Sequence, residues 1–169
     1  VYKIEENQVV LEDMVFNIQD ELTVIKDSLH FLAIKNNNQI FIEVDNSIPE
    51  VLVGDKIRLS QIFINLLSNS LKFTYNGKII VKAKTLQIVG TKYHIQFQVI
   101  DNGIGIAKEN QNKVFEKFVQ VYRKEDDYQG TGLGLTIVKK LVELFQGTIH
   151  LESEENVGTT FFFTIGNHS

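Results

Sequence analysis

The chain has 169 residues, enough for one domain with a substantial core, and its 43% hydrophobic and 22% charged residues are ordinary for a soluble protein. A formal net charge of -4 gives no electrostatic reason to expect nucleic acid as a partner, and no apolar stretch is long enough to span a bilayer. The absence of Cys excludes disulfides, Cys-ligated metals and thiol nucleophiles. We expect a cytoplasmic chain without direct membrane contact, and an anchor elsewhere in a parent protein stays open.

The first half of the chain predicts two helices with a strand between them. Residues 18–36 carry Leu and Ile at helical spacing after a candidate N-cap, Asn17, and residues 40–44 alternate as a strand. Residues 47–54 contain the only Pro and predict a loop. A second helix begins after Asp55, extends to about residue 75, and has an apolar face predicted to comprise Ile57, Ile62, Ile64, Leu66, Leu67 and Leu71.

The second half predicts the rest of a sheet and a third helix. Side chains in residues 92–100 alternate between apolar and polar, so we expect one face of the sheet to be exposed to solvent and helices to cover the other face. A short helical piece contains Val114, Phe115 and Phe118, and a third helix runs from about Gly132 to a left-handed cap at Gly147. The predicted strands are 78–86, 92–100, 148–153 and 159–165. The predicted fold class is α/β: a two-layer sandwich with a mixed sheet, three main helices on one face and a lid.

Glycine clusters are the most informative local features of the sequence. The phosphate loop of P-loop enzymes needs Gly-Lys followed by Ser or Thr, but Gly77 and Lys78 run into Ile79. The dinucleotide-binding pattern is not completed at residues 103–105 or at residues 130–132. Each cluster taken alone is more often a tight turn than a ligand site.

Five segments in a fixed order change this interpretation. Residues 65–74, 101–105, 114–118, 130–135 and 158–161 closely resemble the asparagine box, first glycine box, phenylalanine box, second glycine box and terminal Gly-Thr element of sensor histidine kinases. That family belongs with gyrase, the MutL repair proteins and a heat-shock chaperone in a superfamily of ATP-binding sandwiches. The resemblance implies a catalytic ATP-binding domain over residues 17–169. It also implies that residues 1–16 are a strand and junction from a missing dimerisation and phosphoacceptor domain.

The asparagine box has a physical interpretation of its own. Asn65, Asn69 and Lys72 are spaced by four and three, so they share one face of an otherwise apolar helix. A polar stripe there costs free energy unless a polar group meets it, and Mg²⁺ on a nucleotide takes few protein ligands. The resemblance implies a catalytic role for these three residues, with Asn69 as the Mg²⁺ ligand and Lys72 on the phosphates. The alternative is that both Asn side chains cap neighbouring backbone.

The first glycine box predicts recognition of adenine. Asp101 ends a strand, so its carboxylate can accept a hydrogen bond from the exocyclic amino group, while Gly103 and Gly105 let the backbone approach the base. The resemblance implies that Thr159 bonds to the same base edge through water and that Ile106 lines the pocket. The alternative for this segment is a surface turn.

The second glycine box predicts contacts with the phosphates of ATP. Gly130, Gly132 and Gly134 lead into the third helix, whose free N–H groups and positive dipole end suit a triphosphate. The resemblance adds Thr131 and Leu133 to this binding segment. A flexible hinge is the alternative, and the family uses these glycines as both.

The segment between these boxes predicts a mobile lid and a docking surface. Residues 119–129 are polar without clear periodicity, and Arg123 and Lys124 in them would either reach the phosphates or belong to a solvated charge run. The resemblance implies that Phe115 and Phe118 contact the phosphoacceptor domain, and that a response-regulator receiver acts downstream. Lys117 and Ser70 depart from the usual Pro and Ala of the family without disrupting the nucleotide site.

Three functions fit these patterns, and the first is favoured. A kinase domain would bind ATP and Mg²⁺ and donate the γ-phosphoryl group to a histidine on a separate domain. A superfamily ATPase would place a general-base Glu where this chain has Asn65, and a nucleotide-sensing module would bind ATP without transfer. The histidines His30, His94, His150 and His168 do not lie in an acceptor motif, so we expect no autophosphorylation by the chain alone.

Overall fold

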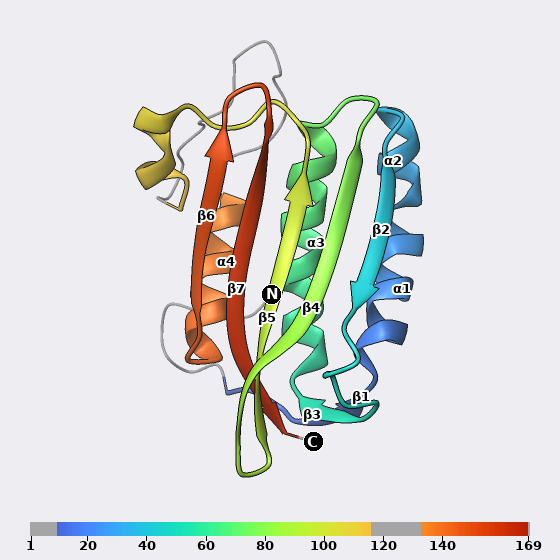
Figure 1. Ribbon diagram of the computed structural model, residues 1–169, viewed down its shortest axis with the longest axis vertical. Helices are drawn as coiled ribbons and strands as arrows, with labels where there is room; N and C mark the ends of the chain where they lie inside the picture. The colour runs from blue at the N-terminus through green and yellow to red at the C-terminus, as the bar shows by residue number, and fades with distance from the viewer. Residues whose placement is uncertain (1–9, 116–132, 169) are drawn as a thin grey trace.

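The computed structural model describes residues 10–115 and 133–168, and these residues form a mixed sheet backed by helices (Figure 1). In the described part of the chain the sheet has seven strands in the order β1-β3-β7-β5-β4-β2, and β6 also pairs with β7. The β2–β4 pair is parallel, whereas the other pairs are antiparallel.

The element bounds are as follows. The strands are β1 (Met14–Phe16), β2 (Gln39–Val44), β3 (Leu52–Gly54), β4 (Lys78–Val89), β5 (Lys92–Asp101), β6 (Thr148–Glu154) and β7 (Gly158–His168). The helices are α1 (Ile18–Ser28), α2 (His30–Lys35), α3 (Lys56–Lys72), α4 (Leu133–Leu144) and the 3₁₀ helix η1 (Lys108–Lys113).

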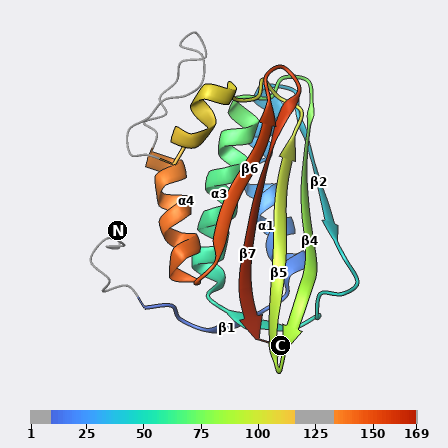
Figure 2. The same ribbon diagram turned by 60° about the vertical axis from the view of Figure 1, so that its left-hand side comes forward.

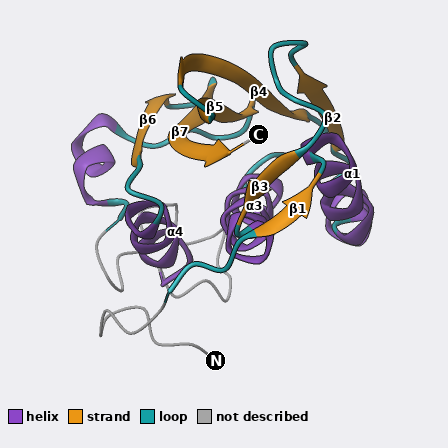
Figure 3. Cartoon of the chain, turned by 90° about the horizontal axis from the view of Figure 1, so that it is seen from below, coloured by secondary structure: helices purple, strands orange, loops and turns teal. Residues whose placement is uncertain are grey.

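The predicted two-layer α/β sandwich with helices on one face is confirmed. Figure 2 shows α1, α3 and α4 on the same side of the sheet, and Figure 3 shows α3 between the other two. Along β5 the side chains Ile95, Phe97 and Val99 are buried, while Gln96 and Gln98 on the opposite face remain partly exposed. This alternation is what a sheet covered on one face requires.

The core lies between α3 and the middle of the sheet. The rings of Phe63 on α3, Phe97 on β5 and Phe163 on β7 have centroids 5.1–5.3 Å apart, and all three side chains have no exposed surface. Aromatic contacts at this spacing stabilise the native state beyond the area that they bury. Among the helices of the described residues, none has both the length and the apolar character that a bilayer crossing requires.

The helix predicted over residues 18–36 is interrupted near Leu29. Asn17 is the N-cap of α1 as predicted, and its side chain accepts a hydrogen bond from the backbone N–H of Asp20 at 2.9 Å. The Ser28 hydroxyl donates to the carbonyl of Ile25, and a Ser side chain bonded back in this way bends a helix. The predicted single helix is therefore two, α1 and α2, which the apolar spacing alone did not separate.

Helix α3 starts where predicted, but its apolar face is narrower than predicted. Its N-cap Asp55 is buried and accepts a hydrogen bond from the N–H of Arg58. Ile57 and Ile64 are exposed, because they fall outside the stripe that faces the sheet. The buried residues of that stripe are Leu59, Ile62, Phe63, Leu66, Leu67, Ser70 and Leu71.

Two predicted boundaries were wrong. The loop predicted over residues 47–54 contains β3, which is three residues long and therefore too short to show a readable alternation. The short helical piece predicted around Val114 lies earlier, as η1, and Val114 is its C-cap. Phe118 and the lid predicted over residues 119–129 lie outside the described residues.

The end of α4 shows why Gly147 is required, and the reason differs from the prediction. The left-handed residue is Gln146, with a φ of 60°. A Cβ atom at Gly147 would overlap the carbonyl oxygen of Thr164 on β7. Gly147 therefore permits a close approach between the helix end and the sheet, and its neighbour adopts the left-handed conformation.

Candidate functional site

The predicted base-binding residues lie at one end of the sheet. Asp101 is the last residue of β5, and it pairs with Ile79 at the start of β4 and with Thr159 at the start of β7. The loop after Asp101 returns to the end of α3, where the N–H of Ile104 bonds to the carbonyl of Phe73 at 3.0 Å. The asparagine box and the first glycine box, which are far apart in the sequence, therefore meet at this end.

The Asp101 carboxylate is largely buried and held by backbone donors. Its Oδ1 atom accepts hydrogen bonds from the N–H groups of Gly103 (2.9 Å) and Thr159 (3.2 Å). Burial raises the pKa of this carboxyl above its ordinary value, and hydrogen bonds from Gly103, Ser70 and Thr159 partly oppose that shift. Because both backbone bonds end on Oδ1, the carboxylate keeps Oδ2 as an acceptor for a ligand donor.

Gly103, Gly105 and Gly158 are required by the fold itself. A Cβ atom at Gly103 would overlap the carbonyl of Phe73, and one at Gly105, where φ is 74°, would overlap the carbonyl of Glu154. A Cβ atom at Gly158 would overlap the carbonyl of Asp101. The space that these glycines leave thus faces the chain's own backbone, a reason for glycine at these positions that the sequence alone did not show.

The polar stripe on α3 is half-buried, as a stripe that faces a partly open site would be. Asn65, Asn69 and Lys72 all have intermediate exposure. Asn69 and Lys72 interact with other groups of the protein, so they are held in place rather than fully solvated. Asn69 is the one predicted metal ligand, and the described residues contain no group of three or more His, Cys, Asp or Glu side chains that could hold a metal ion.

Two buried hydroxyls next to the base site lack partners. The Oγ atom of Ser70 and the Oγ1 atom of Thr74 have no hydrogen-bond partner of good geometry among the described residues, although Ser70 is close enough to lower the pKa of Asp101. Thr74 abuts the loop at Gly103. Buried hydroxyls are normally paired, so these two fit a site completed by a polar ligand or by ordered water.

A second wall of the site was missed from the sequence. The Ser153 hydroxyl on β6 accepts from the N–H of Ile106 (2.8 Å), donates to the carbonyl of Gly158 (3.0 Å) and lies 2.8 Å from the Thr159 hydroxyl. Gln111 on η1 donates to the carbonyls of Ile106 and Ser153, each at 2.9 Å. Ile106, predicted to line the pocket, is 1% exposed and belongs to the core.

No periodic pattern marks Ser153 or Gln111, because each side chain also joins segments that are far apart along the sequence. The signal that could have located Ser153 was the predicted hairpin of the last two strands, β6 and β7. If its register had been known, Ser153 would have been placed opposite Thr159, the pair that the structure shows.

The phosphate segment is described only in part. Gly130, Thr131 and Gly132 lie outside the described residues, and Leu133 is the first residue of α4. Gly134 is exposed in the first turn of α4, and a Cβ atom there would meet open space. The first turn of a helix has N–H groups without partners inside the helix, and such groups suit an anion.

Phe115 lies between this helix and the sheet. Its ring packs against Phe161 on β7 with centroids 6.1 Å apart, and its carbonyl accepts a hydrogen bond from the Thr136 hydroxyl on α4 at 3.1 Å. The side chain is half-buried and packs against the core. Phe115 thus has an exposed part next to the start of the segment predicted to be the lid.

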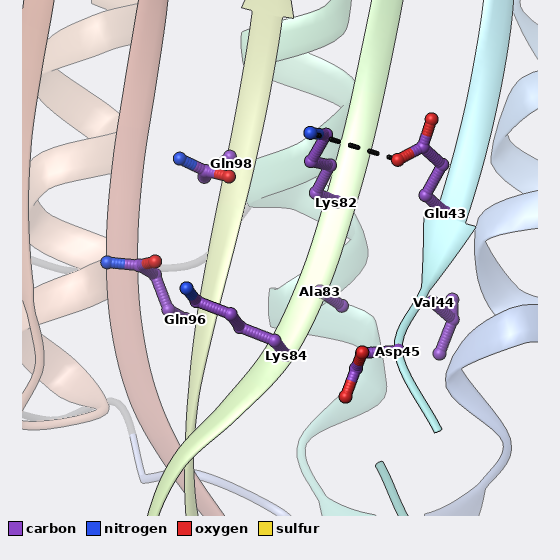
Figure 4. A pocket seen from close by; sticks show the side chains of 8 residues that line it. All are labelled: Glu43, Val44, Asp45, Lys82, Ala83, Lys84, Gln96 and Gln98. Atoms are coloured by element: carbon purple, nitrogen blue, oxygen red, sulfur yellow. Dashed lines mark ion pairs between the residues drawn. The ribbon is translucent and has the colours of Figure 1, made fainter. Parts of the chain in front are cut away.

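The pocket in Figure 4 is separate from this site. It lies on the uncovered face of the sheet, over β2, β4 and β5, with a volume of about 410 Å³. It holds two acidic side chains, Glu43 and Asp45, and two basic ones, Lys82 and Lys84, and Lys82 pairs with Glu43 at 3.8 Å in a setting where both are exposed. Such a pair contributes little, and the balanced charges favour no charged ligand.

Comparison with known proteins identifies the domain. The sequence profile of the histidine kinase-, DNA gyrase B-, and HSP90-like ATPases matches residues 54–168, more than half of the chain. The chain belongs to this family. Histidine protein kinase 1 of Candida albicans is 43% identical over 169 residues, which cover 96% of the chain and 7% of that protein.

Solved histidine kinases have the same fold. Full-length ShkA, solved with AMPPNP, matches 98% of the chain and 33% of its own with a TM-score of 0.83 and 28% identity. The nucleotide-free catalytic domain of ThkA matches 91% of the chain and 95% of its own, with a TM-score of 0.74 and 30% identity. ThkA in complex with the response regulator TrrA matches 96% of the chain and 44% of its own, with a TM-score of 0.71 and 27% identity.

Within this ATPase family the chain is a catalytic ATP-binding domain of the histidine kinase type. It spans 7% of the length of the Candida kinase and 33% of ShkA, so it corresponds to one part of much longer proteins.

Proposed function

We propose that this domain binds ATP with Mg²⁺ and donates the γ-phosphoryl group to a histidine on a separate dimerisation domain. The observation that carries the proposal is the Asp101 carboxylate, held at the end of β5 by two backbone donors and bordered by the buried Ser70 hydroxyl. This arrangement offers an acceptor to the exocyclic amino group of adenine, which guanine lacks at that position. The loop after Asp101 meets the end of α3, the helix that carries the polar stripe of Asn65, Asn69 and Lys72.

The residues of the site divide between base and phosphates. Asp101 accepts from adenine and Thr159 bonds to the same edge through water, while Lys72 and the N–H groups at Gly134 hold the phosphates. Asn69 supplies an oxygen ligand to Mg²⁺, which takes its other ligands from phosphate and water. When bound, Mg²⁺ neutralises charge that develops on the transferred group.

Transfer to another residue is favoured over hydrolysis because of Asn65. An amide cannot act as a general base toward water, and phosphoryl transfer depends on positioning and charge stabilisation. A histidine delivered by a separate domain would therefore react in preference to solvent. An ATP-sensing module without transfer is the alternative, and it predicts nucleotide binding with no phosphate on the parent protein.

We further propose that Phe115 and Phe118 contact the dimerisation domain and that a response-regulator receiver accepts the phosphate downstream. The exposed part of Phe115 beside α4 supports the first contact. ThkA, a similar kinase, is solved in complex with a response regulator, which supports the second. A cytoplasmic location without nucleic-acid or membrane contact completes the proposal.

Binding and transfer are tested separately. Titration calorimetry of the chain with Mg-ATP and Mg-GTP tests the base site, and equal affinity for both would contradict the assignment of Asp101. Omission of Mg²⁺ should weaken ATP binding, and Asn69→Ala should remove most of that dependence. Radiolabelled ATP with the full-length parent should give acid-labile phosphate on a histidine; binding without this product would favour the sensing module.

A further inference from the structure

Gln111 links the base site, formed by Asp101 and Thr159, to Phe115 through hydrogen bonds. The amide lies on η1, between the loop after Asp101 and Phe115. We infer that Gln111 is a positioning residue that couples occupancy of the base site to the conformation at Phe115. The inference rests on the proposed nucleotide binding and names the route by which the nucleotide would act on the docking surface.

Gln111 uses both hydrogens of its amide nitrogen. Nε2 donates to the carbonyl of Ile106 at 2.9 Å and to the carbonyl of Ser153, also at 2.9 Å. These carbonyls come from two separate pieces of chain, the loop after β5 and the strand β6. One side chain therefore holds η1 against both pieces.

The Ser153 hydroxyl continues the connection to the base site. It bonds to the N–H of Ile106 and lies 2.8 Å from the Thr159 hydroxyl, and the N–H of Thr159 bonds to Oδ1 of Asp101. Asp101, Thr159, Ser153 and Gln111 thus form a continuous series of hydrogen-bonded residues. Buried or half-buried series of this kind polarise one another and fix the relative positions of their members.

The other end of η1 leads directly to Phe115. The helix has no side-chain N-cap bond, so Gln111 supplies the described side-chain anchor between Ala107 and the buried Val114. Phe115 follows, with its carbonyl bonded to Thr136 on α4 and its ring against Phe161. A ligand that fixes the positions of Asp101 and Thr159 would therefore affect the conformation of Phe115 through Gln111.

A ligand shifts a conformation only when it favours one state over another. With the Gln111 donor present, adenine binding at Asp101 favours one placement of η1. Without the donor, base binding persists but no longer biases Phe115. The coupling, and not the fold or the affinity alone, is the quantity to measure.

The chain has no Trp and five Tyr, so Phe115→Trp introduces a single Trp, which can be excited apart from the tyrosines, at the Phe115 end of the series. In this background, Mg-ADP should change the Trp emission, and calorimetry measures affinity in parallel. Gln111→Leu should remove at least half of the emission change while ADP affinity falls by less than about ten-fold. Gln111→Lys, which restores a donor, should recover most of the change.

Asn112→Leu is the matched control, because Asn112 is exposed on the same 3₁₀ helix, and it should leave both readouts unchanged. Ser153→Ala interrupts the series from the other side and should act like Gln111→Leu. Three results would overturn the coupling alone. They are a full emission change in Gln111→Leu, a loss of emission change in Gln111→Lys equal to that in Gln111→Leu, and a Trp emission in the Phe115→Trp protein that does not change when ADP is bound. Failure of the parent to bind ADP would overturn the proposed function as well.

Discussion

The ionised Asp101 carboxylate is expected to lower the free energy of unfolding at neutral pH, and the same carboxylate is expected to bind the ligand. Burial raises its pKa, so the folded chain binds a proton more tightly than the unfolded chain. The free energy of unfolding therefore falls as pH rises from the ordinary value of 3.8 through the raised pKa, and it stays lower at neutral pH. Asp101→Asn should raise the melting temperature at pH 7 and weaken ADP binding about 10- to 100-fold, since a hydrogen bond to a charged group is lost.

Thermal melts and calorimetry at pH 7 measure both effects. The gain in melting temperature over the parent should shrink as pH is lowered toward 3.8, because the parent carboxyl then becomes neutral too. A variant that is less stable at pH 7 and binds ADP as the parent does would contradict this role of Asp101.

The same carboxyl should give nucleotide binding a pH dependence. The charged form accepts the amino group of adenine, so affinity should fall as pH drops through the raised pKa, beginning above the pH expected for an ordinary Asp. Calorimetric titrations with ADP over a pH series provide the measurement. Asp101→Asn should lack this dependence, and an identical acid limb in both proteins would assign it to another group.

Ser70 offers a smaller change of the same kind. Its buried hydroxyl has no hydrogen-bond partner of good geometry among the described residues, although its contact with Asp101 lowers the pKa of that carboxyl, so Ser70→Ala should raise stability by no more than about 1 kcal/mol while ADP affinity falls about 3- to 10-fold. Melting curves with and without ADP show both effects together. Ser68→Ala, a half-buried neighbour on α3, should change neither, and a destabilised Ser70→Ala would mean that the hydroxyl is paired within the protein.

Single residues were predictable where one local signal sufficed. Asp101 ends a strand whose alternation is readable, and Asn65, Asn69 and Lys72 share a face by helical spacing alone. Ser153 and Gln111 were not found, because the bond between them joins residues 42 positions apart. The close backbone contacts that require Gly103 and Gly105 were not predictable, since the overlapping atoms come from other segments of the backbone.

At the scale of elements, two substitutions at the junction between α4 and β6 are expected to change the stability of the domain in opposite directions. Gly147→Ala would place a methyl group against the Thr164 carbonyl and should destabilise the domain by about 3 kcal/mol. Gln146→Gly would relieve a left-handed φ of 60° and should leave stability unchanged or raise it by up to about 1 kcal/mol. Denaturant melts of both variants measure the difference, and the opposite order would restore Gly147 as the left-handed cap.

Long elements with clear periodicity were predicted, and short or interrupted ones were not. The apolar stripe of α3 recurs through four turns and is capped by Asp55, so its start was readable. β3 has three residues, and it is defined by pairing with β1 and with the end of β7. The interruption after Ser28 depends on one hydroxyl bond, which leaves the apolar spacing of residues 18–36 unchanged.

At the scale of the whole molecule, the topology gathers the site from distant segments. β5 lies between β4 and β7, so its carboxyl end meets the start of both neighbours, and α3 delivers its last turn to the same end. α3 also packs between α1 and α4 (Figure 3). The base site is therefore built on a strand in the interior of the sheet and on a helix packed between two others, which gives its donors and acceptors fixed positions.

This topology predicts that the chain alone will not phosphorylate its own histidines. His168 pairs with Lys92 at the opposite end of β5, whose ten residues span about 30 Å at about 3.3 Å per residue. His94 pairs with Gly166 near the same far end. His150 stacks on Phe162 with ring centroids 4.9 Å apart, and Phe162 points away from the helices because its neighbours Phe161 and Phe163 are fully buried. None of these three could reach a phosphate held beside α3 and α4 without unfolding part of the sheet.

His30 is exposed at the start of α2. Helix α2 lies on the β2 side of α3, whereas α4 lies on the other side (Figure 1). Incubation of the chain with radiolabelled Mg-ATP should therefore give no acid-labile phosphate, while calorimetry under the same conditions shows binding. Addition of a dimerisation domain carrying an acceptor histidine should restore the product, because positioning of the nucleophile accounts for most of the missing rate. Acid-labile phosphate on any of the four histidines of the chain alone would show that a residue within this fold reaches the nucleotide.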